Sequence, residues 1–112
     1  MCGMALSYVI LEHTVNGGKH FDLMLEVPGQ EKLRTLQLQA RLLKTGDTCA
    51  FKELDPHRRA YLEYEGEVSG NRGTVKRIER GTYEALGASV LFSPEGEPTY
   101  RIELQRDSAL RW

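Results

Sequence analysis

The sequence has few of the features that mark secreted, membrane-bound or cysteine-stabilised proteins. Cys2 and Cys49 are the only cysteines among 112 residues, and without CxxC spacing they form neither a disulfide framework nor a zinc site. No window approaches the roughly 18 apolar residues that cross a bilayer. The first residues lack the basic flank and apolar run of a signal peptide. We therefore expect reduced thiols and a cytoplasmic protein with no membrane partner.

The chain also lacks an excess of either charge. Fifteen basic residues stand against sixteen acidic ones, for a formal net charge of -1. This balance argues against broad, sequence-independent electrostatic binding along duplex DNA or RNA. Binding at one phosphate or one strand end stays open, because a divalent cation can supply local positive charge.

Alternating apolar and polar residues dominate the chain, and stretches of helical spacing are few. The pattern predicts one all-β domain over residues 1–112, a small antiparallel β-barrel of about seven or eight short strands with glycine and proline turns. Residues 40–56 allow either a long loop or a short helical turn with an edge strand. The predicted strands are residues 6–14, 20–27, 32–39, 60–68, 74–80, 82–86, 89–93 and 99–106.

The turn between the first two predicted strands arranges three polar side chains. Asn16-Gly17 favours a two-residue type I′ hairpin, in which His13 lies opposite His20 and Asp22 shares their face. The other face is mostly apolar, so a one-residue slip would drive the polar residues into the core. Two imidazoles and a carboxylate suit Mn²⁺, Fe²⁺ or Zn²⁺ and leave positions for water or substrate. A hairpin with a merely solvated polar face remains the alternative.

Three motifs in order resemble a known family. "H-x6-HFDLMLE", which begins at His13, is followed by "DPHRRAYLEYEGEVSGNRGTV" and "RGTYE". This order is similar to the 3′-phosphoesterase domain of bacterial DNA ligase D, of which the chain resembles a divergent, stand-alone member. The resemblance runs from about Tyr8 to Arg106 and is weak between Gly29 and Phe51. It implies a compact β-barrel that binds Mn²⁺ and trims 3′ ends, removing a terminal ribonucleoside and then the 3′-phosphate in DNA break repair.

The resemblance also implies roles for individual residues. His13, His20 and Asp22 match the metal ligands, with Mn²⁺ expected first and Zn²⁺ or Fe²⁺ open. His57 and Tyr61 match the catalytic residues that contact the scissile phosphate. Such a histidine could stabilise transition-state charge or protonate the leaving oxygen, while the metal polarises phosphoryl oxygens. The expected partners are a nucleic-acid 3′ end as substrate and a separate ligase or polymerase.

Two features depart from the family pattern. Met24 stands where the family has an arginine that binds phosphate, and a thioether offers neither charge nor a donor. The spacing from His13 to His20 is one residue longer than usual, which the Asn-Gly register absorbs. If the phosphoesterase activity is weak because this arginine is absent, replacing Met24 with arginine is predicted to raise the activity.

Several further residues carry weaker predictions. Arg72 and the backbone of residues 69–74 could bind an anion, although a hairpin turn is the favoured interpretation. Tyr61 and Tyr64 are expected on opposite faces of a strand. Glu65 would then support the metal histidines from behind.

Three other classes of function stay open. The first is a non-catalytic module that binds metal or phosphate at nucleic-acid ends, favoured by no turnover with or without an arginine at position 24. The second is a non-haem iron oxygenase, since His20-x-Asp22 with a distant histidine imitates that ligand set, and oxygen consumption with Fe²⁺ would reveal it. The third is an interaction domain without a site, which would bind no divalent ion.

Overall fold

The computed structural model describes residues 6–39, 48–68, 72–87, 89–104 and 109–111, and most of these residues lie in β-strands, which confirms the all-β class. No helix in these ranges has the length and apolar character needed to cross a membrane. The elements are β1 (Leu6–Val15), β2 (Gly18–Leu25), β3 (Leu33–Leu38), β4 (Thr48–His57), the 3-10 helix η1 (Arg59–Leu62), β5 (Gly66–Glu67), β6 (Thr74–Leu86), β7 (Ser89–Pro94), β8 (Tyr100–Leu104) and β9 (Ala109–Arg111).

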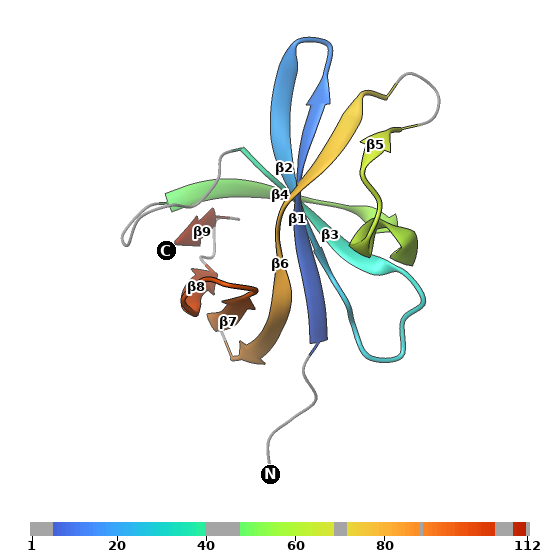
Figure 1. The fold of residues 1–112 in the computed structure, drawn as a ribbon. Helices are drawn as coiled ribbons and strands as arrows, with labels where there is room; N and C mark the ends of the chain where they lie inside the picture. Colours follow the sequence, from blue (N-terminus) through green and yellow to red (C-terminus); the bar gives the residue numbers. More distant parts are fainter. Residues whose placement is uncertain (1–5, 40–47, 69–71, 88, 105–108, 112) are drawn as a thin grey trace.

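The strands form one antiparallel sheet that returns to its own beginning. Its order is β1-β2-β3-β4-β9-β8-β7-β6-β5, and β1 also pairs with β6. This additional pairing joins eight strands in a ring and leaves β5 beside β6, which confirms a small antiparallel β-barrel. The β1–β2 hairpin and the first half of β6 extend beyond the ring, with β5 alongside (Figure 1).

The β1–β2 hairpin has the predicted register. Asn16 and Gly17 both have positive φ, 50° and 79°, as a type I′ turn requires. His13 pairs with His20 and Val15 pairs with Gly18. The turn chemistry therefore places the polar residues on one face, as the sequence predicts.

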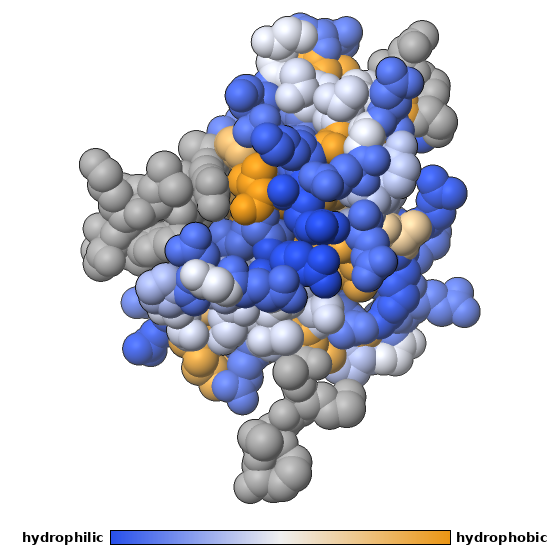
Figure 2. Space-filling view, in the orientation of Figure 1, coloured by the Kyte–Doolittle hydropathy of each residue, from blue (hydrophilic) through white to orange (hydrophobic). Residues whose placement is uncertain are grey.

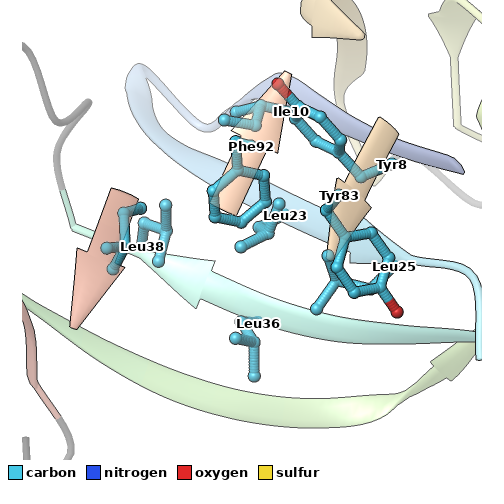
Figure 3. Packing of buried hydrophobic residues seen from close by; sticks show 9 residues of the cluster. Tyr8, Ile10, Leu23, Leu25, Leu36, Leu38, Tyr83 and Phe92 are labelled. Carbon is cyan, nitrogen blue, oxygen red and sulfur yellow. The ribbon is translucent and has the colours of Figure 1, made fainter. Parts of the chain in front are cut away.

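The inner face of this hairpin packs in the barrel interior. We call the buried apolar group there the inner cluster. Tyr8 and Phe92 meet edge to face at 4.7 Å between ring centroids. Burial and a hydrogen bond to Glu79 raise the pKa of Tyr8, so its hydroxyl stays a donor to that carboxylate. The members of the inner cluster, most of them labelled in Figure 3, are Tyr8, Ile10, Leu23, Leu25, Leu36, Leu38, Tyr83, Phe92 and Ile102.

The outer face of the same hairpin is also apolar next to the barrel. We call this second group the outer cluster, and it is covered by η1 and the segment that follows it. The sequence interpretation treated this face as polar, which is correct only near the turn. The members of the outer cluster are Val9, Leu11, Met24, Leu33 and Val75, with Tyr61, Leu62 and Val68 packed against them.

Residues 60–68 do not form the predicted strand. The amides of Tyr61 and Glu63 donate to the carbonyls of Arg58 and Ala60 over 3.1 and 3.0 Å, which are i to i+3 bonds of a 3-10 turn. Only Gly66–Glu67 pairs as a strand. The alternation of tyrosine and glutamate in this stretch imitates strand periodicity, but packing on the outer cluster favours a compact turn.

Gly81 does not divide residues 74–86 into two strands, as the sequence suggested. β6 runs through it, and a Cβ atom there would lie 2.1 Å from the carbonyl oxygen of Ser93. Glycine is therefore needed for the close approach of β7. Residues 48–57, left open between loop and edge strand, form β4, and β9 was not predicted. The start of that open segment, residues 40–47, lies outside the described residues.

Candidate metal centre

Three predicted ligands converge at the edge of the outer cluster. His13 Nδ1 lies 3.2 Å from His20 Nε2 and 3.4 Å from Asp22 Oδ2. His20 Nε2 lies 3.2 Å from Asp22 Oδ1. The side chains of His13 and His20 are 18% and 20% exposed and that of Asp22 is 5% exposed, so the carboxylate forms the floor and the imidazoles the rim.

These separations suit one divalent cation. With ligands about 2.1 Å from an ion, neighbouring donors lie about 3.0 Å apart in octahedral and about 3.4 Å apart in tetrahedral geometry. The three observed donor separations fall in or near this range. Two nitrogens and a carboxylate on one side of an ion would leave its remaining positions for water or substrate.

The tautomer of His13 leaves the correct nitrogen for a metal. His13 Nε2 lies 2.6 Å from the carbonyl oxygen of Arg72, which can only accept, so Nε2 carries the proton and Nδ1 keeps its lone pair. A backbone carbonyl behind a ligating histidine orients the ring and raises its basicity. Arg72 therefore contributes its carbonyl to the site, a role that the sequence did not indicate.

Gly73 makes this contact possible. Its φ is +86°, and a Cβ atom there would lie 1.9 Å from the carbonyl oxygen of Thr14. Only glycine tolerates both the conformation and the approach to β1. The bond between the amide of Val68 and the carbonyl of Gly73, 2.8 Å long, fixes the same segment from its other side.

The buried carboxylate of Asp22 lacks part of its hydrogen bonding. The residue is 3% exposed, and Oδ1 has no hydrogen-bond partner among the described residues. Burial raises the pKa of Asp22, while the charges of His20, His13 and His57 oppose the rise. A buried, unsatisfied carboxylate oxygen beside two imidazoles is what a bound cation would compensate.

A bulge in β4 turns His57 toward this face. Leu33 pairs with His57 and Thr35 with Leu54, so three steps on β4 oppose two on β3. Asp55 and Pro56 together oppose one residue of β3, and Pro56 has no amide proton to offer a ladder. Without the bulge, strand alternation would put His57 on the opposite face. The β4 bulge therefore brings the predicted phosphate residue to the site.

The environment of His57 suits a contact with substrate. Its Nδ1–H donates to the carbonyl of Asp55 over 2.9 Å, which leaves Nε2 for a ligand. His57 pairs with Leu33, a member of the outer cluster, so its side chain lies on the same face of the sheet as that cluster. The ring of Tyr61 meets the ring of His57 edge to face at 5.7 Å between centroids. All five residues predicted for metal and phosphate thus lie in one region.

Two cationic residues lie in the cross-strand row that passes through Asp22. Leu11 pairs with Asp22 on one side and with Arg77 of β6 on the other. Asp22 pairs with Gln37, and Gln37 pairs with Lys52 of β4. Directly paired residues share a face, so the row reads Arg77, Leu11, Asp22, Gln37, Lys52. The positions of Lys52 and Arg77 beside the site could not be predicted from the sequence, because the pairing of β4 was unknown and the register between β1 and β6 contains a bulge.

Met24 is a member of the outer cluster and is 1% exposed. Its strand partner Thr35 is 0% exposed. An arginine at position 24 would bring a guanidinium into this apolar environment, where an unpaired charge is strongly destabilising. We therefore expect Met24→Arg to lower stability, and the substitution is a poor route to higher activity.

Tyr64 and Glu65 lie differently from their predicted positions. The ring centroids of Tyr61 and Tyr64 are 5.8 Å apart, because the chain folds back after η1 and the Tyr64 amide donates to the carbonyl of Ala60 over 3.0 Å. The prediction of opposite faces is wrong. Glu65 Oε2 accepts a 2.8 Å hydrogen bond from the amide of Arg77, so this carboxylate supports β6 and not the histidines.

The face of the molecule that Figure 2 presents is largely polar. Figure 2 shows hydrophilic side chains gathered where β1, β2 and β6 cross, with smaller hydrophobic areas between them.

No protein-family model matches the chain, and no curated protein matches it. A function for this chain is therefore inferred from the residues of the site and their geometry.

Proposed function

We propose that this protein is a metal-dependent phosphoesterase that acts on the 3′ ends of nucleic acids, in the cytoplasm and beside a separate ligase or polymerase. One observation carries the proposal. The donor atoms of His13, His20 and Asp22 lie 3.2–3.4 Å apart around an unsatisfied buried oxygen. His57 and Tyr61, which the resemblance assigns to the phosphate, lie in contact with each other in the same region.

The three ligands would hold one ion, and Mn²⁺ suits their nitrogen and oxygen donors, with Zn²⁺ or Fe²⁺ as alternatives. When bound, such an ion supplies positive charge that polarises phosphoryl oxygens and orients water. The 18% and 20% exposure of the two imidazole side chains supports access of a strand end to this position.

His57 would act on the leaving oxygen or on the phosphoryl oxygens. Its Nδ1–H is held by the carbonyl of Asp55, so Nε2 is the nitrogen that can donate to a substrate when the ring is protonated. The edge of Tyr61 limits rotation of the imidazole. General acid catalysis of this kind contributes about 10²–10⁴-fold to the rate.

Lys52 and Arg77 would take the place of the arginine that the family has at position 24. They flank Asp22 in its cross-strand row, two strands away on either side. Strands lie about 4.8 Å apart, so long cationic side chains can reach a phosphate group at the metal centre. We expect Lys52→Gln to raise KM for a 3′-phosphate end roughly tenfold, about 1.4 kcal/mol, and to leave Mn²⁺ affinity unchanged. An unchanged KM would remove Lys52 from the site.

The chain contains only three histidines, so single substitutions can test metal binding and trimming separately. Labelled primer-templates ending in a 3′-phosphate or one ribonucleotide are incubated with Mn²⁺ or EDTA. His20→Ala should lose both Mn²⁺ binding and trimming, whereas His57→Ala should keep Mn²⁺ binding and lose trimming. Trimming that persists in EDTA or in His20→Ala would contradict the proposal.

The burial of Met24 supports a second candidate function. In this alternative the protein is a module that binds metal and phosphate at nucleic-acid ends without turnover. It is favoured because the family guanidinium is absent and the outer cluster occupies its place. Mn²⁺ binding that depends on His20, with no trimming of either primer-template, would support this candidate over the enzyme.

A further inference from the structure

Tyr64 is unusually exposed for its size. It is 40% exposed, and the other large hydrophobic side chain exposed among the described residues is Leu86, 46% exposed at the end of β6. An isolated exposed apolar residue needs no explanation. Tyr64 differs from Leu86 because it belongs to a continuous series of rings.

The series leads from the metal centre to solvent. The ring of His57 meets Tyr61 at 5.7 Å and 70°, and the ring of Tyr61 meets Tyr64 at 5.8 Å and 87°. His57 is half-buried and pairs with Leu33 of the outer cluster, Tyr61 is half-buried on the same cluster, and Tyr64 is exposed. The exposed end of this series therefore lies two ring contacts away from the residue assigned to the phosphate.

Tyr64 is also held in place. Its hydroxyl donates to the carbonyl of Glu67, and its amide donates to the carbonyl of Ala60 over 3.0 Å. Gly66, whose φ is +124°, lies beside the hydroxyl end of Tyr64, and a Cβ atom there would be 3.5 Å from the Tyr64 hydroxyl. A side chain fixed at its hydroxyl, with its ring partly in solvent, is pre-organised for stacking.

We infer that Tyr64 is a stacking site for the terminal base of a nucleic-acid strand whose 3′ phosphate lies at the metal centre. The inference rests on the proposed function and makes it more specific, because the substrate becomes a strand end and not a small phosphate ester. Aromatic side chains stack on any base, since each base has a π face. Tyr64 is a binding residue in this account, and the chemistry remains with His57.

Binding is measured with an oligonucleotide that ends in 2-aminopurine and a 3′ hydroxyl, a product-like end that cannot be trimmed further by phosphate removal. Tyr64→Ala should weaken binding about 5- to 150-fold, the range for loss of one base–aromatic stack, and should abolish quenching of the terminal base. Tyr64→Phe should bind only slightly more weakly than the unaltered protein and clearly more tightly than Tyr64→Ala, because it keeps the stacking ring and loses only the hydroxyl that holds it. Leu86→Ala is the matched control and should bind normally.

Kinetics distinguish a base contact from a structural effect. With Mn²⁺, Tyr64→Ala should raise KM for a 3′-phosphate oligonucleotide and leave KM for p-nitrophenyl phosphate unchanged. If Tyr64→Ala does not fold, Tyr64→Leu keeps apolar bulk without the π face and carries the same test.

The outcomes separate this inference from the proposed function. Quenching that depends on Tyr64 in a protein that trims nothing would keep the stacking site and overturn the phosphoesterase. Trimming that is indifferent to Tyr64→Ala, or Tyr64→Phe as weak as Tyr64→Ala, would overturn the stacking site alone. No binding of the oligonucleotide to the unaltered protein would overturn the stacking site, and Mn²⁺-dependent trimming by the same protein would still support the phosphoesterase.

Discussion

The two faces of the β1–β2 hairpin are both buried, yet they have different neighbours. The inner cluster lies within a ring of eight strands, and its members come from β1, β2, β3, β6, β7 and β8. The outer cluster is smaller and is covered by η1 and Val68. The three candidate ligands lie where this smaller cover ends, so one hairpin is a barrel wall on one side and the floor of a site on the other.

This difference explains how a buried carboxylate can face solvent-accessible imidazoles. The outer cluster removes water from Asp22, while the hairpin extends past the cover and leaves His13 and His20 half-buried. A buried charge beside an opening is suited to a cation that enters from solvent. Among the residues that the structure describes, the inner cluster contains no comparable group of ligands.

The largest expected effect compares one leucine from each cluster. Leu23→Ala in the inner cluster and Leu11→Ala in the outer cluster should each lower the free energy of unfolding by about 2–5 kcal/mol, since both side chains are buried. Leu11 pairs directly with Asp22, so Leu11→Ala alone should also weaken Mn²⁺ binding, by roughly tenfold. Denaturant unfolding and calorimetry of Mn²⁺ binding measure the two quantities. Equal loss of Mn²⁺ affinity in both variants would show that the clusters are not distinct in function.

A backbone substitution tests the support behind His13. Gly73→Ala should move the carbonyl of Arg72 away from His13 Nε2, because its Cβ would collide with the carbonyl of Thr14. Loss of such support weakens metal binding by about 10–100-fold. The matched control is Gly87→Ala at the β6–β7 turn, which also has positive φ, +68°, but meets nothing within 4 Å. The comparison fails if both substitutions change Mn²⁺ affinity equally.

The smallest effect concerns a pair outside both clusters. Arg34 donates to both carboxylate oxygens of Glu53, over 2.8 and 3.1 Å, and this hydrogen bonding lowers the pKa of Glu53. The stabilisation is therefore present above the ordinary glutamate pKa of about 4.3 and is lost as pH falls through the lower folded value. Because Glu53 is 51% exposed, we expect less than about 1 kcal/mol.

The measurement is the unfolding free energy of the unaltered protein and of Glu53→Gln at pH 7 and pH 3. The difference between them should be present at pH 7 and smaller at pH 3. Asp22 titrates in both proteins and cancels in the comparison. A difference that is as large at pH 3 as at pH 7 would mean that packing, not charge, accounts for it.

The sequence predicted the hairpin site well because its signals are local. Asn16-Gly17 determines the turn, the turn determines the pairing of His13 with His20, and alternation places Asp22. The β-barrel class followed from the many short alternating runs. These features need no knowledge of distant contacts.

The parts that were missed depend on distant contacts or on breaks in alternation. The bulge at Pro56 determines the face of His57, and the pairing of β4 determines the place of Lys52. One signal for the outer cluster was present, since the continuous apolar runs of residues 8–11 and 23–25 are typical of strands buried on both faces. The strand-like spacing of Tyr61 and Tyr64 misled the prediction, because burial of Tyr61 on the outer cluster favours η1.

The most direct test of the account is Mn²⁺ binding to the unaltered protein and to Asp22→Asn, by calorimetry, with metal-free thermal unfolding measured alongside. The asparagine keeps the size of the side chain and removes the buried charge. We predict one Mn²⁺ per chain for the unaltered protein, at least about 100-fold weaker binding for Asp22→Asn, and a metal-free melting temperature that does not fall. Equal Mn²⁺ affinity in the two proteins, or no binding to either, would contradict the claim that the outer face of this hairpin is a metal site.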